Sequence, residues 1–459
     1  MRYVSTRGAS PPQSFDEILL SGLAPDGGLY MPDHWPQISQ AEIASFAGKP
    51  YADVAFAILK RFTADSFSDA DLKSDIDAAY ADFDAPEIAP LVEIAPGHFL
   101  LELFHGPTLA FKDIAMQVLG RLFARALAKR GGRATILAAT SGDTGSAAIA
   151  AFAGLPNIDV FVIHPKGRVS EVQRRQMTTA SATNIHNIAL EGTFDDAQAL
   201  VKTLFADKVF AQATNLTAVN SISFARIAAQ CVYYFAATAK LGSAATFVVP
   251  TGNFGDVFAG EAAMRMSLPI KKLIVATNAN DIVTRALNEG IYKSGTALPT
   301  LSPSMDIQVA SNFERALFEA SGRNAKWIGD VMDEFARARQ LTIPPEMLMP
   351  LRERYEAGRA DDAETLDTMA AVFREIGRPI DPHTAVALAV ARKAKLSGPV
   401  VVLSTAHPAK FPDAVARATG QKPPLPLRLK GLYDGVERYT VLPDNAAALR
   451  SFIKDRLPL

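Results

Sequence analysis

The stretch ATILAATSGDTGSAAIAAF, residues 134–152, decides the fold. It begins with a short, almost wholly apolar run, continues through a loop of small residues at 141–145, and ends in an alanine-rich helical pattern. An apolar run this short, followed by a loop and a helix, is typical of a buried strand in a parallel α/β sheet. Such sheets bind ligands beyond the carboxyl ends of their strands, so we expect the functional site in the loops that follow the strands.

Further short apolar runs, each followed by a loop and a helical pattern, occur along the chain. They are VFVIHP (160–165), ATFVVPT (245–251), KLIVATN (272–278) and VVVLST (400–405), and helical patterns such as DIAMQVLGRLFARALAKR (113–130) lie between them. Buried strands that alternate with helices predict a parallel sheet covered on both faces. We therefore expect an α/β protein.

The composition is that of an ordinary globular chain. Of the 459 residues 49% are hydrophobic and 21% are charged, and the formal net charge of −1 provides no basic field for nucleic acid. No run of about 18 apolar residues is present, so we expect no membrane span. The single cysteine, Cys231, is expected in the core and fits a reducing compartment, so we expect a cytoplasmic protein.

Residues 1–92 are expected to form an N-terminal unit. In it Ser14 is followed by Glu17 in a capping-box pattern, and SDADLKSDIDAAYADF (68–83) is a second capped helix candidate. A proline-rich stretch at 84–98 links this unit to the α/β region, for which we expect the range 93–415. Residues 416–459 are expected to pack on that region as a C-terminal segment.

Three strand exits carry candidate binding residues, and two of them suit an anion such as phosphate. The loop 141–145 opens a helix whose first N–H groups favour an anion, although Asp143 would repel one unless it engages something else. The loop Gly252–Asp256 can cradle a phosphate with backbone N–H groups, and it matches neither the nucleoside-triphosphate nor the dinucleotide pattern. Thr405 ends the third strand and offers a neutral hydroxyl.

Lys112 lies near the end of HGPTLAFKD (105–113), a turn-prone and apolar stretch. The ordinary interpretation is a solvated lysine at a helix start, because lysine is almost never fully buried without a reason. Taken together with the three strand exits, Lys112 instead suggests a pyridoxal phosphate pocket in which its amine captures the cofactor's aldehyde. Asp113 is expected to face away from that amine, because adjacent side chains on a helix diverge by about 100°.

With these motifs in place, the chain resembles the threonine synthase family of fold-type II (tryptophan synthase β-like) pyridoxal-phosphate enzymes. The resemblance spans residues 3–412 and rests on YVSTRG, GLAPDGGLYMP, LFHGPTLAFKD, TSGDTG, VNSISFARI, PTGNFGD, DPHTAVAL and STAHPAKFP. It implies two parallel-sheet αβ subdomains with the cofactor in the cleft between them, together with an N-terminal unit typical of the family. It also implies the last step of threonine biosynthesis, in which a lyase converts O-phospho-L-homoserine and water to L-threonine and phosphate.

The resemblance also implies roles for individual residues. Lys112 would hold the cofactor covalently, Thr405 would face its pyridine nitrogen, and Asp143 would lie near its phenolic oxygen. The cofactor-binding set is then Lys112, Asp143, Gly252, Asn253, Phe254, Gly255, Asp256 and Thr405. The substrate-binding set is Ser141, Gly142, Thr144, Gly145, Asn220, Ser221 and Arg226. Which residues bind the substrate's phosphate is left open among Asn220, Ser221, Arg226, Lys166 and Arg168.

Two other functions remain open at this point. One is a serine/threonine dehydratase or a β-replacing enzyme of the same fold, against which the stretch GGLYMP (27–32) argues. The other is a catalytically silent protein that binds pyridoxal phosphate or a phospho-ligand, against which the context of Lys112 argues. No metal site and no nucleic-acid or membrane partner is expected, and the sequence leaves monomer and homodimer open.

Overall fold

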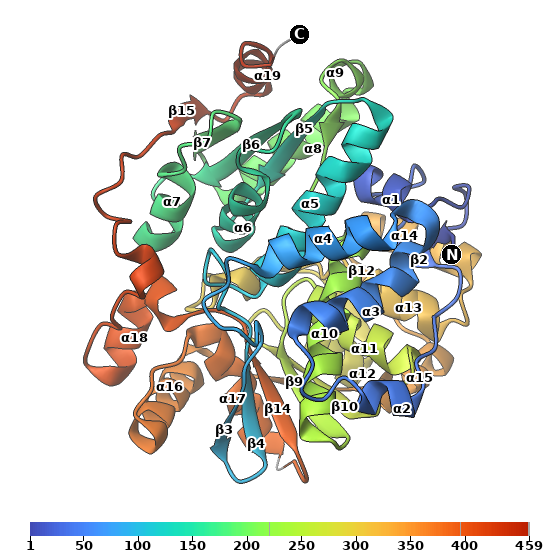
Figure 1. Ribbon diagram of the computed structural model, residues 1–459, viewed down its shortest axis with the longest axis vertical. Helices are drawn as coiled ribbons and strands as arrows, with labels where there is room; N and C mark the ends of the chain where they lie inside the picture. The colour runs from blue at the N-terminus through green and yellow to red at the C-terminus, as the bar shows by residue number, and fades with distance from the viewer. Residues whose placement is uncertain (220, 395, 458–459) are drawn as a thin grey trace.

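The computed structural model describes residues 1–219, 221–394 and 396–457. Two sheets built mainly from parallel strands lie one above the other in Figure 1, and the N-terminal helices lie along one side of them. The predicted α/β fold is confirmed, and each of the five apolar runs named above forms a strand. Because parallel strands end at one edge of their sheet, the loops that follow them gather between the two sheets.

The larger sheet has six strands in the order β13-β10-β9-β14-β4-β3, all parallel except for the antiparallel pair β3 and β4. Side chains that alternate along its strands pack into two different cores, so helices cover both faces. Phe247 and Val249 face α10 and α11, whereas Val248 faces α16 and α17. The bounds are β3 Leu91–Ala95, β4 His98–Glu102, β9 Ala245–Pro250, β10 Ile270–Thr277, β13 Tyr355–Arg359, β14 Val400–Ser404, α10 Phe224–Leu241, α11 Gly255–Arg265, α12 Ile282–Glu289, α16 Asp362–Ile376 and α17 Pro382–Ala394.

The second sheet has five parallel strands in the order β15-β7-β6-β5-β8. Alternate side chains again face two cores: Val160 and Val162 share a core with α5 and α6, and Phe161 and Ile163 share one with α8 and α19. The bounds are β5 Ala134–Ala139, β6 Ile158–Pro165, β7 Ile185–Glu191, β8 Leu216–Thr217, β15 Thr440–Pro443, α5 Lys112–Arg130, α6 Asp143–Phe152, α7 Glu171–Thr178, α8 Phe194–Ala206, α9 Lys208–Ala213 and α19 Ala446–Lys454.

The N-terminal segment packs onto α5 and α10 and shares one continuous hydrophobic core with them. The predicted capping box at Ser14 and Glu17 is present, and Ser68 caps the second predicted helix. The expected boundary at residue 92 falls inside β3, a strand of the larger sheet. The bounds are β1 Tyr3–Ser5, α1 Phe15–Ser21, β2 Tyr30–Pro32, α2 Gln40–Ala44, α3 Tyr51–Thr63, η1 Ala64–Ser66 and α4 Asp69–Tyr80.

The remaining elements complete the larger subdomain and the C-terminal segment. They are β11 Ile291–Lys293, which pairs with β12 Gln340–Thr342, η2 Pro303–Met305, α13 Phe313–Ala320, α14 Ala325–Ala338, α15 Pro345–Arg354, η3 Pro408–Lys410, α18 Pro412–Thr419 and η4 Leu427–Leu429. The last residues return to the second sheet, because β15 pairs with β7. The division of the chain at residues 92 and 415 stays a prediction.

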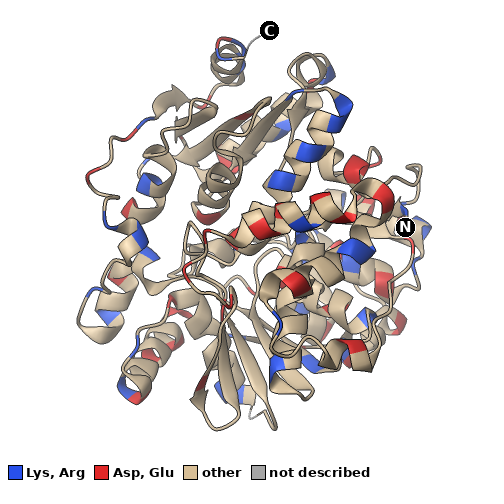
Figure 2. Ribbon diagram, viewed as in Figure 1, with Lys and Arg blue, Asp and Glu red and all other residues tan. Residues whose placement is uncertain are grey.

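Charged residues are spread over the outer helices, with basic and acidic positions intermixed along the ribbon of Figure 2. Cys231 is buried in α10, where its thiol contacts the carbonyl oxygen of Ala259 at 3.3 Å, as expected for a core residue. Within the described residues, no helix combines the length and the apolar character needed to cross a bilayer.

Candidate active site

The three strand exits predicted from the sequence line one pocket together with Lys112. Asp143 and Thr144 follow β5, Thr405 follows β14, and the loop Gly252–Asp256 follows β9. The pocket is also lined by Phe111, Ser221, Arg226, Gln230, Pro250, Thr251, Val257, Ser304, Met305, His383 and Ala406. The structure therefore brings together all eight residues of the predicted cofactor set.

The predicted substrate set is only partly brought together. Thr144, Ser221 and Arg226 line the pocket, whereas Ser141, Gly142 and Gly145 are not among its lining residues. Asn220 lies outside the described residues. Of the other two candidates for the substrate's phosphate, Lys166 and Arg168 are exposed and do not line the pocket.

Lys112 is the first residue of α5, and its side chain is almost fully buried. The preceding turn is fixed to the end of β14, because the N–H of Phe111 donates to the carbonyl of Thr405 at 2.8 Å. The Lys112 amine lies 4.8 Å from the centre of the Phe111 ring. Burial lowers the pKa of Lys112, and the positive charges of Arg226 and Lys410 lower it further. The negative charge of Asp143 raises it but does not outweigh them. Burial in this pocket therefore disfavours the charged form of the amine.

Asp113 faces away from the Lys112 amine, as expected. Its carboxylate accepts hydrogen bonds from the N–H of Thr108 at 2.8 Å and from the hydroxyl of Thr108 at 2.7 Å. These bonds close the turn that precedes α5. A side chain at Gly106 would collide with this arrangement, because its Cβ would lie 2.4 Å from the Cβ of Asp113. The carboxylate of Asp113 therefore fixes the conformation of the turn HGPT (105–108).

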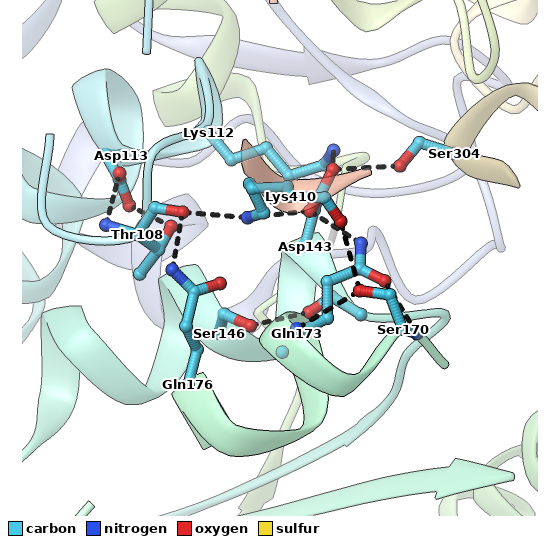
Figure 3. Close-up of polar contacts among 12 residues, drawn as sticks. Thr108, Lys112, Asp113, Asp143, Ser146, Ser170, Gln173, Gln176, Ser304 and Lys410 are labelled. Atoms are coloured by element: carbon cyan, nitrogen blue, oxygen red, sulfur yellow. Dashed lines mark hydrogen bonds and ion pairs between the residues drawn. The ribbon is translucent and has the colours of Figure 1, made fainter. Parts of the chain in front are cut away.

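Asp143 is buried at the start of α6 and is surrounded by four donors (Figure 3). Its Oδ1 lies 2.8 Å from the Lys410 amine and accepts a hydrogen bond from Gln173 at 2.9 Å. Its Oδ2 accepts a hydrogen bond from Ser304 at 3.0 Å and lies 3.5 Å from the Lys112 amine. Burial alone would raise the pKa of Asp143, but the nearby charges of Lys410, Lys112 and His383 hold it well below the usual range.

The loop after β5 is shaped by a single hydroxyl. Thr140 Oγ1 accepts from the N–H of Gly142 at 3.0 Å and from the N–H of Gly145 at 2.8 Å. Gly142 has a φ of +133°, a conformation that favours glycine, and a Cβ at Gly145 would lie 2.5 Å from Thr140 Cγ2. These glycines set the path of the chain and leave the N–H groups of Asp143 and Thr144 at the helix start without intrahelical acceptors.

The loop Gly252–Asp256 leads directly into α11, so its backbone lies at a helix N-terminus that favours an anion. Phe254 has a φ of +62°, and the carbonyl of Asn253 accepts hydrogen bonds from both the N–H and the side-chain amide of Asn312 at 3.0 Å. These contacts fix the loop. A Cβ at Gly252 would lie 2.8 Å from the carbonyl oxygen of Ser304, so the close approach requires glycine here.

Two buried groups in the pocket lack hydrogen-bond partners among the described residues, and one of them, Arg226, is a cation that suits an anion. Arg226 is buried, yet its Nη1 has no hydrogen-bond partner among the described residues, and burial lowers its pKa to about 10. Asp256 Oδ2 is likewise without a partner in the described part of the chain. Buried polar groups are nearly always satisfied, so an orphaned guanidinium nitrogen beside a glycine loop fits a phosphate group, and Lys112 fits an aldehyde.

Replacing Gly252 by alanine is expected to weaken retention of pyridoxal phosphate at least tenfold, because the new methyl group must displace the Ser304 carbonyl or the loop itself. Equilibrium dialysis of the purified variant against limiting cofactor measures the effect. Gly431→Ala is the matched control, since a Cβ at Gly431 meets nothing within 4 Å. Equal retention by the two variants would show that the loop does not hold the cofactor.

Asp256 is expected to make stability depend on pH. Burial raises the pKa of its carboxyl to about 7, although hydrogen bonds from Tyr233 and Tyr234 oppose the shift. Between about pH 4 and pH 7 the folded state then binds more protons than the unfolded state. The free energy of unfolding should therefore fall as pH rises through this window, by up to about 1.4 kcal/mol per pH unit from this group. Urea denaturation of the cofactor-free protein and of Asp256→Asn tests this, because the variant should lose that slope.

Sequence reasoning missed several groups around Asp143. His383 lines the pocket, its Nδ1 lies 2.8 Å from Asp381 Oδ1, and its Nε2 accepts from the N–H of Ser304 at 3.3 Å. Lys410 and Gln173 contact Asp143 directly. The stretches DPHTAVAL and STAHPAKFP contain His383 and Lys410, so the motifs were visible although the roles of these two residues were not.

Comparison with known proteins decides the family. The descriptions "Threonine synthase N terminus", "Pyridoxal-phosphate dependent enzyme" and "Threonine synthase, C-terminal" match residues 2–80, 84–343 and 384–453. The threonine synthase of Pseudomonas aeruginosa is 50% identical over 99% of this chain and 98% of its own length. The chain belongs to the threonine synthase family. The expected membership of the pyridoxal-phosphate enzymes, and with it the expected cofactor and lyase class, is thereby confirmed.

Solved structures of threonine synthases share the whole fold. The structure described as PLP-bound threonine synthase from Brucella melitensis is 48% identical, with a TM-score of 0.97 and full coverage of both chains. The yeast threonine synthase is 36% identical, with a TM-score of 0.94 over 99% of this chain and 98% of its own. The predicted fold-type II arrangement with a threonine-synthase-type N-terminal segment is therefore confirmed for this member of the family.

Proposed function

We propose that this threonine synthase family member converts O-phospho-L-homoserine and water to L-threonine and phosphate. One observation carries the proposal: the buried Lys112 lies in the same pocket as a glycine loop and a strand-end hydroxyl. In the reaction the bond between Cγ and the phosphate oxygen breaks and phosphate leaves. Cβ loses one proton and gains a hydroxyl from water, and Cγ gains one proton.

Pyridoxal phosphate, when bound, supplies an aldehyde for an amine and a ring that withdraws electrons from the substrate. The residues of this chain then have distinct tasks. Lys112 holds the cofactor and moves a proton at the substrate's Cα, for which its amine must be neutral. The loop Gly252–Asp256 binds the cofactor's phosphate, and Thr405 faces the pyridine nitrogen. Asp143 lies near the phenolic oxygen.

The substrate is proposed to bind through its two anionic groups. The helix-start N–H groups in the loop 141–145, those of Asp143 and Thr144, suit the substrate's carboxylate. The guanidinium of Arg226 suits the substrate's phosphate, because it is buried, positively charged and short of an acceptor among the described residues. Asn220 and Ser221 are proposed to bind the same phosphate.

Incubation of the purified protein with O-phospho-L-homoserine tests the proposal. We expect phosphate and threonine in equal amounts, and no product from a Lys112→Ala variant. Release of ammonia and a 2-oxo acid from serine or threonine, without threonine synthesis, would assign a dehydratase instead. A protein that binds pyridoxal phosphate and turns over none of these substrates would be a silent binding protein.

Thr405→Val is expected to weaken cofactor binding by about 1–3 kcal/mol, because the ring nitrogen loses its only proposed partner while the side chain keeps its shape. Thr405→Asp should place a carboxylate at that nitrogen, keep the nitrogen protonated and change the cofactor's visible spectrum. Ser404→Ala is the control, since the Ser404 hydroxyl bonds Thr384 at 3.0 Å. In a structure with cofactor bound, a Thr405 hydroxyl farther than about 3.5 Å from the ring nitrogen would reject this role.

We also propose a cytoplasmic location, because a chain with a single cysteine suits a reducing compartment. Size-exclusion chromatography with light scattering is expected to give a monomer or a homodimer.

A further inference from the structure

A second buried lysine, Lys410, belongs to the same network as Lys112, and the proposed reaction gives it no task. Its side chain is fully buried in the short turn η3. Its amine lies 2.8 Å from Asp143 Oδ1 and donates to the carbonyl of Thr108 at 2.8 Å (Figure 3). Lysine is almost never buried in this way unless it is paired, so the position calls for a specific role.

The carboxylate of Asp143 interacts with the two lysines unequally. Lys410 is hydrogen-bonded to Oδ1, whereas the Lys112 amine is 3.5 Å from Oδ2, at the limit of a hydrogen bond. Gln173 and Ser304 donate to the two oxygens at 2.9 and 3.0 Å. The strongest contact of the carboxylate is therefore with Lys410 and not with Lys112.

Lys410 is itself held in place by the segments that surround the pocket. Its carbonyl accepts from the hydroxyl of Ser170, at the start of α7, at 3.2 Å. The Thr108 carbonyl that it binds also accepts from Gln176 at 3.0 Å, and Thr108 belongs to the turn that precedes Lys112. The Lys410 amine thus connects this turn to the start of α6.

We propose that Lys410 is a positioning residue whose ammonium group holds and neutralises the carboxylate of Asp143, which leaves the amine of Lys112 free to react. The proposal rests on the proposed function in one respect, namely that Lys112 is the cofactor lysine. An amine locked in an ion pair with a buried carboxylate keeps its proton, and a protonated amine cannot attack an aldehyde.

The charges that face this network agree with the assignment. Lys410 and Arg226 both lower the pKa of Lys112, and Lys410 contributes more than Lys112 does to the low pKa of Asp143. The other titratable groups that act on the network are Asp256 near Lys112, His383 near Asp143, and Asp113 and His407 near Lys410. Without Lys410, Lys112 would be the one lysine left beside the carboxylate of Asp143.

The pH dependence of covalent cofactor capture tests this proposal. Cofactor-free protein is mixed with pyridoxal 5′-phosphate at a series of pH values, and the absorbance change gives the capture rate. In this step the neutral amine adds to the aldehyde carbon and one water molecule leaves, so the midpoint reports the amine's pKa. Lys410→Met should raise the midpoint by about one pH unit or more. A folded Lys410→Met protein with a shift below about half a unit would overturn the proposal.

The double variant Asp143→Asn/Lys410→Met decides the matter even if the single variant does not fold, because it leaves no unpaired charge in the pair. If Lys410 neutralises Asp143 in the natural protein, removing both charges should leave the midpoint within about half a unit of its natural value. A fall of about one unit or more would mean that Asp143 acts mainly on Lys112, which contradicts the proposal. The assay uses no O-phospho-L-homoserine, so its outcome is independent of whether the protein makes threonine.

Discussion

Replacing Lys112 by alanine is expected to abolish covalent retention of pyridoxal phosphate and to lower turnover of O-phospho-L-homoserine by about a thousandfold or more. The loss is large because one amine serves twice, first to hold the cofactor and then to move a proton. Borohydride reduction of the natural protein, followed by peptide mapping, should place the label on Lys112.

Lys166→Ala is the matched control for this prediction. Lys166 is an exposed lysine that pairs with Glu191 at 3.2 Å on the surface, so its loss should change neither labelling nor turnover. A borohydride label on Lys410 or any other lysine of the natural protein would contradict the assignment of Lys112.

Asp143→Ala is expected to have the largest effect on stability, lowering the free energy of unfolding by about 3–5 kcal/mol at pH 7. The variant leaves the buried Lys410 amine without its counter-charge, and it removes the acceptor of Gln173 and Ser304. Because the pKa of Asp143 is held low in the folded state, its contribution is present above about pH 4 and is lost as pH falls below that.

Denaturant titration of the natural protein and the variant measures this difference. Asp69→Ala is the control, since Asp69 forms an exposed ion pair with Lys60. Such pairs contribute about 0–1 kcal/mol. If Asp143→Ala costs no more than Asp69→Ala, then the buried network around Asp143 does not stabilise the fold.

The parts of the fold that the sequence predicted are those in which local pattern and tertiary environment agree. The runs that form β5, β6, β9, β10 and β14 are continuously apolar because both faces of their sheets are covered. Their burial can therefore be predicted from the sequence alone. The capping box at Ser14 is similarly local. Lys112, Thr405 and the loop Gly252–Asp256 could be selected as candidates because each follows a recognisable strand or turn, and the structure places them in one pocket.

The strands that the sequence did not reveal are those whose pattern is broken by polar or turn-forming residues. LVEIAPGH (91–98) contains proline and glycine and belongs to the predicted linker 84–98, yet residues 91–102 form the antiparallel pair β3 and β4. The strand β15 has only four residues, none of them buried, and its place beside β7 depends on the rest of the sheet. None of these three strands has the long, continuous apolar run that marks the buried strands.

Lys410 shows why the polar network could not be predicted. In AHPAKFP (406–412) a lysine between two prolines has the features of an exposed turn, and the acidic residue nearest in sequence, Asp413, is not the one that Lys410 pairs with. Its partner, Asp143, lies in the other subdomain, so the burial of both groups exists only after the two sheets come together. Periodicity reports which face of an element is apolar, but it does not report which charges meet across a cleft.

The strand order of the larger sheet has a consequence for how the molecule is made. β14 lies in the middle of that sheet, between β9 and β4, although it is the last of the six strands in the chain. While the protein is being synthesised, the edges of β4 and β9 that later pair with β14 therefore remain unpaired until residues 400–404 leave the ribosome. Long-range pairing of this kind is slow and leaves strand edges open to aggregation. Emerging chains of this protein should therefore depend on chaperones at least until β14 has been synthesised.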